Sequence, residues 1–274
     1  SELPMTAPNL TFRECLLEYA SRIVEVPALV APAASITYGE LAGEVRALAV
    51  ALRSRGIGPD TIVALTARSE VDHLLAALAL LELGAPQVAL ASHDPPAMRL
   101  RLARRVGATL VLADRPDDAV AGIDRIDLGA ALASSRANPR GDAEPGFDAS
   151  IPALYLTGSG TTGEPKVIRF SQHDLARHAD NHINFAGERV LRPAHVEYNN
   201  SKRMRLYTLW QGGTCVFADG TAESLHGQCA RHRVTWLELS PLHGADLLAA
   251  SRVEGMLPAY TAVRVGGARV PIAL

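Results

Sequence analysis

The chain has 274 residues, of which 48% are hydrophobic and 20% are charged, and its formal net charge at pH 7 is −2. This composition predicts a globular protein with a substantial core. The balanced charge and the lack of a basic aromatic patch argue against nucleic acid as the main partner. The longest apolar runs, such as residues 74–81, are too short to cross a bilayer, so we expect no membrane span.

The first half of the sequence alternates helical and strand-like patterns. Thr37 and Glu40 have the spacing of a capping box at the start of a long amphipathic helix, and Gly56 lies where that helix is expected to stop. Expected strands cover residues 61–66, 87–90 and 109–112, and expected helices cover residues 69–83 and 95–106. This alternation predicts βαβ units and a parallel sheet, and therefore an α/β fold with sheets flanked by helices.

Residues 134–150 are rich in proline, glycine and charge, which indicates a surface loop or a subdomain boundary. We therefore expect a first α/β subdomain over residues 1–150 and a second over residues 151–274. In the second part, Ser171 and Asp174 predict a capped helix to about residue 186. Expected strands follow at 214–218, 234–239 and 260–265, with helices near 222–231 and 241–250.

A glycine- and hydroxyl-rich segment at residues 156–166 follows a strand-like run and ends in a lysine. Glycines let the backbone approach an anion, successive N–H groups form a nest, and hydroxyls and a lysine add donors and charge. The chain has two lysines, Lys166 and Lys202, so one of the two lies in this segment. The candidate phosphate-binding residues are Gly158, Ser159, Gly160, Thr161, Thr162, Gly163 and Lys166.

Two other kinds of phosphate-binding loop have patterns related to this segment. Gly158, Gly160 and Gly163 fit the GxGxxG pattern of an NAD(P)-dependent oxidoreductase, but that pattern requires a helix to begin at once. Residues 167–170 instead have a β-branched and aromatic pattern that predicts a second strand, so the segment is expected at the tip of a hairpin. A Walker A loop requires Gly-Lys-Ser/Thr, whereas Glu164 follows the last glycine. The oxidoreductase remains the weaker alternative.

Residues 159–166 resemble the signature loop Thr-Ser-Gly-Thr-Thr-Gly-x-Pro-Lys of the adenylate-forming superfamily, which includes acyl- and aryl-CoA synthetases and peptide-synthetase adenylation domains. Gly158 departs from it, since a threonine or serine is common there. Residues 36–60 and 234–241 are also similar to family segments. The turn formed by Gly266, Gly267 and Ala268 resembles the Gly-Gly-Ala turn whose backbone lies against adenine.

The resemblance implies a substrate pocket near Glu197, Tyr198 and Asn199, where the family places an aromatic residue and a histidine or aspartate. An aspartate there would bind an α-amino group. Asn199 has no such charge, so the resemblance favours a carboxylic acid other than a standard amino acid. The alternative interpretation of residues 197–204 is a polar helix start with an exposed cationic pair, Lys202 and Arg203.

The function implied by the resemblance is ATP-dependent activation of a carboxylic acid (non-standard amino, aryl or acyl) to an acyl-adenylate, with release of pyrophosphate and later transfer to a thiol. The implied cofactors are ATP and Mg²⁺, with CoA or phosphopantetheine as the acceptor. The implied partners are a small carboxylic acid and a carrier protein. Lys166 is the catalytic candidate.

Two histidine patterns indicate no metal centre. His226, Cys229 and His232 recur at three-residue steps, and His178 and His182 are four apart, but neither set has the accompanying ligands of a zinc site. Cys15, Cys215 and Cys229 are odd in number and widely spaced, which indicates reduced thiols. Because no secretory segment opens the sequence, we expect a cytoplasmic protein.

Family members are longer than this chain, which stops after the Gly-Gly-Ala turn. The segments that bind the ribose and magnesium, and a mobile C-terminal domain, are absent from the sequence. The resemblance thus predicts an incomplete large N-terminal domain that turns over poorly by itself. A catalytically degenerate adenylation-like scaffold is the alternative.

Overall fold

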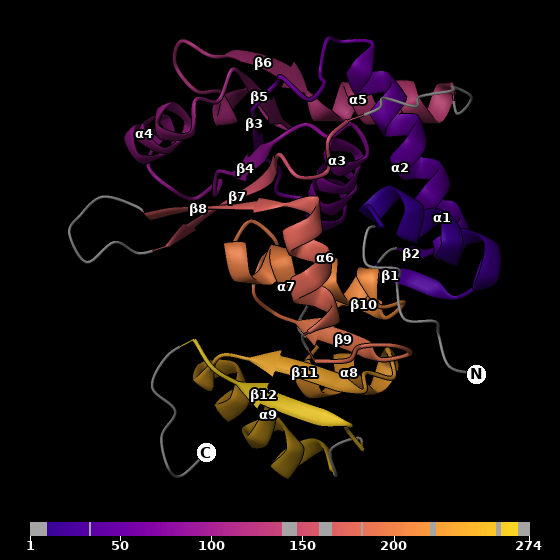
Figure 1. The fold of residues 1–274 in the computed structure, drawn as a ribbon. Coiled ribbons are helices and arrows are strands. Elements are labelled where there is room, and N and C mark those ends of the chain that lie inside the picture. The colour runs from indigo at the N-terminus through magenta and orange to yellow at the C-terminus, as the bar shows by residue number, and fades with distance from the viewer. Residues whose placement is uncertain are drawn as a thin grey trace.

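The computed structural model describes residues 10–32, 34–138, 147–158, 166–181, 183–219, 223–255 and 259–267. The strands of these residues form two six-stranded sheets with helices packed around them (Figure 1). The expected α/β class is confirmed. Among the described residues, no helix has both the length and the apolar character needed to cross a membrane.

The two sheets are mainly parallel, and each ends in one antiparallel strand. Sheet A has the order β12 (Ala262–Val265), β11 (Trp236–Leu239), β9 (Arg189–Arg192), β10 (Thr214–Phe217), β1 (Pro27–Ala31) and β2 (Ala34–Thr37). Sheet B has the order β6 (Asp124–Asp127), β5 (Leu110–Ala113), β3 (Val63–Thr66), β4 (Gln87–Ala89), β7 (Pro152–Gly158) and β8 (Lys166–Ser171).

The helices connect these strands. They are α1 (Phe12–Arg22), α2 (Tyr38–Arg53), α3 (Glu70–Glu82), α4 (Pro96–Val106), α5 (Leu128–Ala137), α6 (Gln172–Asp180), α7 (Asn199–Trp210), α8 (Leu225–Arg231) and α9 (Pro241–Glu254), with a 3₁₀ turn at Pro116–Asp118. The expected helices and strands of the βαβ units are present within a few residues of their expected ends. The sequence patterns did not predict α1, β1, β2, β6, α5 or β9. α7 begins within residues 197–204, where a polar helix start was the alternative interpretation.

Two capping boxes fix helix starts as the sequence indicated. The Thr37 side chain accepts from the backbone N–H of Glu40, and the Glu40 carboxylate accepts from the N–H of Thr37 at 2.8 Å. Ser171 and Asp174 make the same reciprocal bonds at α6. α6 ends at Asp180, so its expected extension to residue 186 is wrong. The backbone N–H of Phe185 is bound by the side chain of Gln211 at 2.7 Å instead of a helical carbonyl.

The sheets cross the boundary that the sequence indicated at residue 150. β1 and β2 join sheet A, where Leu29 pairs with Cys215, whereas β7 and β8 join sheet B, where Gln87 pairs with Leu154. α5 also continues to Ala137, inside the segment expected to be a loop, while residues 139–146 lie outside the described part. The division into 1–150 and 151–274 therefore does not separate one sheet from the other.

One hydrophobic core joins the two sheets. It contains Leu29 and Val190 of sheet A, Leu65 and Leu154 of sheet B, and the almost entirely apolar face of α3. α7 packs into the same core through buried side chains that include Trp210. The elements around a close-packed core are held rigidly. The side chains of α7 therefore have fixed positions relative to both sheets.

Candidate functional site

The segment with the phosphate-loop sequence connects the two strands of an antiparallel hairpin. β7 and β8 pair from Leu154 with Phe170 out to Gly158 with Lys166. The predicted second strand is therefore confirmed. Because β8 starts at Lys166 and α6 starts only at Gln172, the helix that a dinucleotide fingerprint requires is absent from the described residues after the loop. This geometry removes the basis for the oxidoreductase alternative.

The predicted phosphate-binding residues lie at this hairpin to different extents. Gly158 is the last residue of β7, and Lys166 is the first residue of β8 and is exposed. Residues 159–165, which include Ser159, Gly160, Thr161, Thr162 and Gly163, lie outside the described residues. The pairing of Gly158 with Lys166 therefore defines the two ends of the loop. The roles of the loop residues stay predictions.

Asn199 connects α7 to the base of this hairpin. Its side-chain Nδ2 donates to the carbonyl oxygen of Thr157 and, at 2.7 Å, to the Thr157 hydroxyl. Thr157 immediately precedes Gly158, so the first residue of α7 braces the strand that leads into the loop. The side-chain amide of Asn199 thus binds β7 and positions the base of the hairpin.

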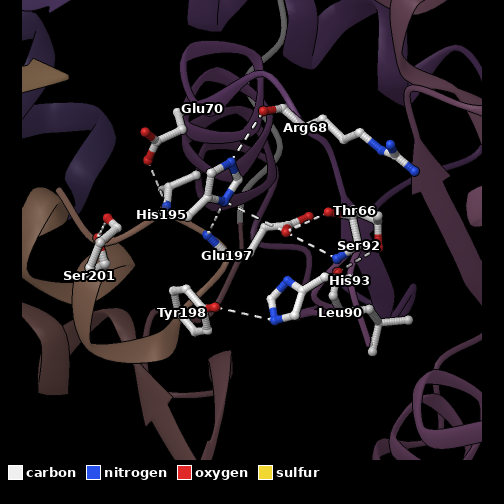
Figure 2. A network of polar contacts seen from close by, with 12 residues as sticks. Thr66, Arg68, Glu70, Leu90, Ser92, His93, His195, Glu197, Tyr198 and Ser201 are labelled. Carbon is white, nitrogen blue, oxygen red and sulfur yellow. Dashed lines mark hydrogen bonds and ion pairs between the residues drawn. The ribbon is translucent and has the colours of Figure 1, made fainter. Parts of the chain in front are cut away.

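Glu197 belongs to a polar network with the segment after β4 (Figure 2). Its side chain is 2% exposed, and Oε2 accepts from the backbone N–H and the hydroxyl of Ser92 at 3.0 and 2.9 Å. In the same network the Tyr198 hydroxyl lies 3.2 Å from His93 Nε2 (Figure 2). These bonds hold the segment before α7 against sheet B.

A cavity of about 250 Å³ lies at the N-terminus of α7. Its lining residues are Arg192, Ala194, Tyr198, Asn200, Ser201, Glu238, Leu239, Ser240, His243, Arg264, Gly266 and Gly267. Of the three predicted pocket residues, Tyr198 lines this cavity and Glu197 and Asn199 do not. The sequence patterns did not identify Arg192, Glu238 and Arg264 as cavity residues. The signal that could have found them is the alternation of polar and apolar residues along their strands.

The cavity lies where parallel α/β sheets commonly bind ligands. It is lined by the carboxyl ends of β9 and β11, and β9 has β10 on its other side. From β9 the chain continues to β10 on one side and then crosses to β11 on the other side, so the strand order reverses between β9 and β11. Crevices at such switch points are the general ligand sites of open α/β sheets. The first turn of α7 connects two segments that are distant in sequence. Asn199 binds the hairpin, and Asn200 and Ser201 line the cavity together with the turn after β12.

The turn after β12 presents bare backbone to the cavity. A Cβ added to Gly266 or Gly267 would meet no atom within 4 Å, and Gly267 has a φ of +86° that favours glycine. The two glycines thus leave open space beside the main chain. Ala268 lies outside the described residues.

The exposed cationic pair considered for residues 202 and 203 is wrong for Lys202. Its side chain is 0% exposed, and Nζ donates to Gln87 Oε1 at 3.3 Å. Burial lowers the pKa of Lys202 to about 7, and the charge of Glu197 acts in the opposite direction. The reason is tertiary: α7 is polar in sequence, yet it packs against both sheets.

Among the described residues, no group of three His, Cys, Asp or Glu side chains is placed to hold a metal ion. His226 of the discounted histidine and cysteine set instead lies 3.3 Å from Glu254, and residue 182 is outside the described part. A magnesium ion typically keeps several waters and binds through one or two carboxylates and substrate phosphates.

Comparisons with known proteins agree with this geometry. Residues 17–274 match the sequence model of the family described as AMP-binding enzyme. The chain is 30% identical over 253 residues to an isonitrile lipopeptide synthase of Streptomyces coeruleorubidus, covering 85% of this chain and 17% of that protein. It is 29% identical over 261 residues to phenyloxazoline synthase MbtB of Mycolicibacterium paratuberculosis, covering 85% and 21%.

Among solved structures, the N-terminal subdomain of Klebsiella oxytoca NpsA is similar in fold, with a TM-score of 0.82 at 23% identity. The match covers 95% of this chain and 68% of that one. The chain thus spans about a fifth of the two synthases and two thirds of the NpsA subdomain. By its family match, its fold and its hairpin, the chain belongs to the AMP-binding enzyme family.

Proposed function

We propose that the chain is part of an enzyme that activates a carboxylic acid with ATP and passes the acyl group to a thiol. The observation that carries this proposal is the hairpin itself. Gly158 pairs with Lys166 at its end, and Asn199 braces its base beside a cavity walled by Gly266 and Gly267. A glycine- and hydroxyl-rich loop held in this way is suited to polyphosphate.

In the proposed reaction a carboxylate oxygen of the acid attacks the α-phosphorus of ATP. A bond forms between that oxygen and phosphorus, the bond from the α-phosphorus to the bridging oxygen breaks, and pyrophosphate leaves with the electron pair. The protein's task in such chemistry is positioning and charge stabilisation. The thiol of CoA or of a carrier's phosphopantetheine then displaces AMP from the acyl-adenylate.

The residues would divide this work between hairpin and cavity. Ser159, Thr161 and Thr162, with the loop N–H groups, would bind phosphate oxygens. The exposed Lys166 would offset the negative charge of the phosphates. Gly266, Gly267 and Ala268 would lie against adenine, which the open space beside the two glycines permits.

Magnesium would be supplied together with ATP. The described residues do not provide a protein-only site for it, whereas Mg²⁺ bound to substrate phosphates is the common arrangement. The thiol acceptor is supported by relatives: one is a fatty acid–[acyl-carrier-protein] ligase and another a 4-chlorobenzoate–CoA ligase. A fused adenylation–PCP didomain of NpsA and ThdA is a structural neighbour, which supports a carrier protein as partner.

We also propose a cytoplasmic location. The support is that Cys15, Cys215 and Cys229 are all buried free thiols, as expected of a reducing compartment.

The test combines ATP binding and pyrophosphate exchange on the purified chain, across aryl, fatty and amino acids. Lys166→Ala is expected to weaken ATP binding about tenfold, the effect of losing one charged hydrogen-bond donor. Arg169→Ala is the matched control: Arg169 is also exposed on β8, three residues away and on the opposite face of the strand. An absence of ATP binding, or a Lys166→Ala variant that binds as the parent does, would favour a non-catalytic adenylation-like module instead.

A further inference from the structure

Three charged side chains cross the wall of the cavity on adjacent strands. Glu238 of β11 is in register with Arg264 of β12, and the register of β9 with β11 puts Arg192 on the other side of Glu238. Arg192 Nε lies 2.6 Å from Glu238 Oε2, and Arg264 Nη1 lies 3.6 Å from Glu238 Oε1. One carboxylate is thus shared by two guanidinium groups, which leaves an excess of positive charge.

Two helix N-termini add partial positive charge to the same space. Asn200 and Ser201 of the first turn of α7 line the cavity, and Tyr198 at the N-cap of α7 makes no side-chain capping bond. Ser240, the N-cap of α9, and His243 line it from the other side. The N-terminus of a helix carries about half a positive charge and favours anions.

Arg192 has a hydrogen-bond donor that no described residue accepts from. The Arg192 side chain is 2% exposed, and its Nη2 has no hydrogen-bond partner among the described residues. A buried guanidinium without full pairing is costly. The Arg264 side chain is 55% exposed and offers accessible donors at the cavity rim, so Arg264 can contact a ligand directly while Arg192 contributes charge from the wall.

Resting on the function proposed above, we propose that the acid carries a second anionic group, and that this cavity selects it. The acid is a short dicarboxylic acid. Its distal carboxylate binds between Arg264 and the N-terminus of α9, where a guanidinium favours a planar carboxylate. Its reacting carboxylate extends toward Gly266 and the hairpin. A volume of about 250 Å³ admits a short dicarboxylic acid.

The first test compares ligands on the unaltered chain by calorimetry. Glutarate and pentanoate have the same number of carbons and differ in the second carboxylate. Glutarate is expected to bind at least tenfold more tightly, the effect of one charge-assisted hydrogen bond. Equal binding of the two acids would mean that the cavity holds only the reacting carboxylate, and would overturn the proposal.

Two substitutions move the affinity in opposite directions. Arg264→Gln removes a cation at the rim and is expected to weaken glutarate about five- to tenfold, a range that allows for the exposure of Arg264. Glu238→Gln removes the competing carboxylate and is expected to strengthen glutarate. Both are expected to leave pentanoate unchanged. Arg252→Gln, an exposed arginine of α9 outside the cavity lining, is the control. Thermal melts confirm folding of each variant.

The readouts keep the two proposals apart. If ATP binds and Lys166→Ala weakens it, while glutarate and pentanoate bind alike, the adenylating function stands and the dicarboxylate proposal fails. If ATP does not bind but glutarate binds in an Arg264-dependent way, the anion site stands and the adenylating function fails. Arg264→Gln with unchanged glutarate affinity would also overturn the anion site.

Discussion

Lys202→Met tests whether a buried lysine releases its proton in the folded protein. Lys202 is fully buried on α7, and its Nζ donates one long hydrogen bond of 3.3 Å to Gln87 Oε1. Burial lowers its pKa from 10.5 to about 7, against the opposing effect of Glu197. Methionine has a similar length and no charge, so it removes the cost of burying an ammonium group.

The sign of the pH dependence follows from proton counts in the two states. Below pH 7 the lysine is protonated in both the folded and the unfolded chain, and the folded state bears the full cost of the buried charge. Between pH 7 and 10.5 the unfolded chain keeps a proton that the folded chain has released. The free energy of unfolding then rises with pH by up to about 1.4 kcal/mol per unit from this group.

Between pH 7 and pH 9 this lysine alone therefore raises the free energy of unfolding of the parent by about 2 kcal/mol. Lys202→Met has no such pH-dependent contribution. Its free energy of unfolding is therefore expected to exceed that of the parent most below pH 7, and the difference is expected to shrink by about 2 kcal/mol between pH 7 and pH 9. Burial raises the pKa of Cys215 and of Cys229 from 9.0 to about 11, so these two thiols make the folded state lose stability mainly as the pH rises from 9 toward 11. That loss is common to both proteins and cancels in their difference.

The assay is urea unfolding at four pH values from 6 to 9, with Lys166→Met as the control. Lys166 is the other lysine of the chain and is exposed on β8, so its replacement is expected to change stability equally at every pH. A difference between Lys202→Met and the parent that stays constant with pH would refute the reasoning. It would show that Lys202 keeps its proton throughout.

Three further substitutions test the packing of the elements that carry the site. Arg205→Met removes a fully buried guanidinium bound to Glu70 at 2.9 Å and is expected to cost about 3 kcal/mol in urea unfolding, whereas exposed Arg101→Met is expected to be neutral. Gly213→Ala places a Cβ 2.5 Å from a backbone oxygen, so a loss of about 1–3 kcal/mol is expected, and unchanged stability would contradict the packing. Thr37→Ala removes the α2 cap and is expected to cost about 1 kcal/mol, with Thr37→Ser as the rescue.

The parts predicted well from the sequence are those that a few neighbouring residues determine. The capping boxes at Thr37 and Ser171 involve groups three residues apart, and both form. The strand after the glycine-rich loop was predicted from residues 167–170, and β8 forms there. Local hydrogen bonds and side-chain alternation act within one element, so the sequence alone carries this information.

The parts missed depend on contacts between distant segments. Sheet membership crosses residue 150 because β1 pairs with β10 and β4 with β7, and no local pattern encodes those partners. α7 is polar in sequence, but Lys202 and Arg205 are buried because both sheets close over it.

By itself, the sequence determined the α/β class, the hairpin with its phosphate-loop motif, and the family resemblance. Only the tertiary structure decided that Asn199 braces the hairpin and that Arg192, Glu238 and Arg264 share one cavity. The physical reason is that a motif is a run of adjacent residues, whereas a binding cavity is assembled from strand ends that are adjacent only after the sheet has formed.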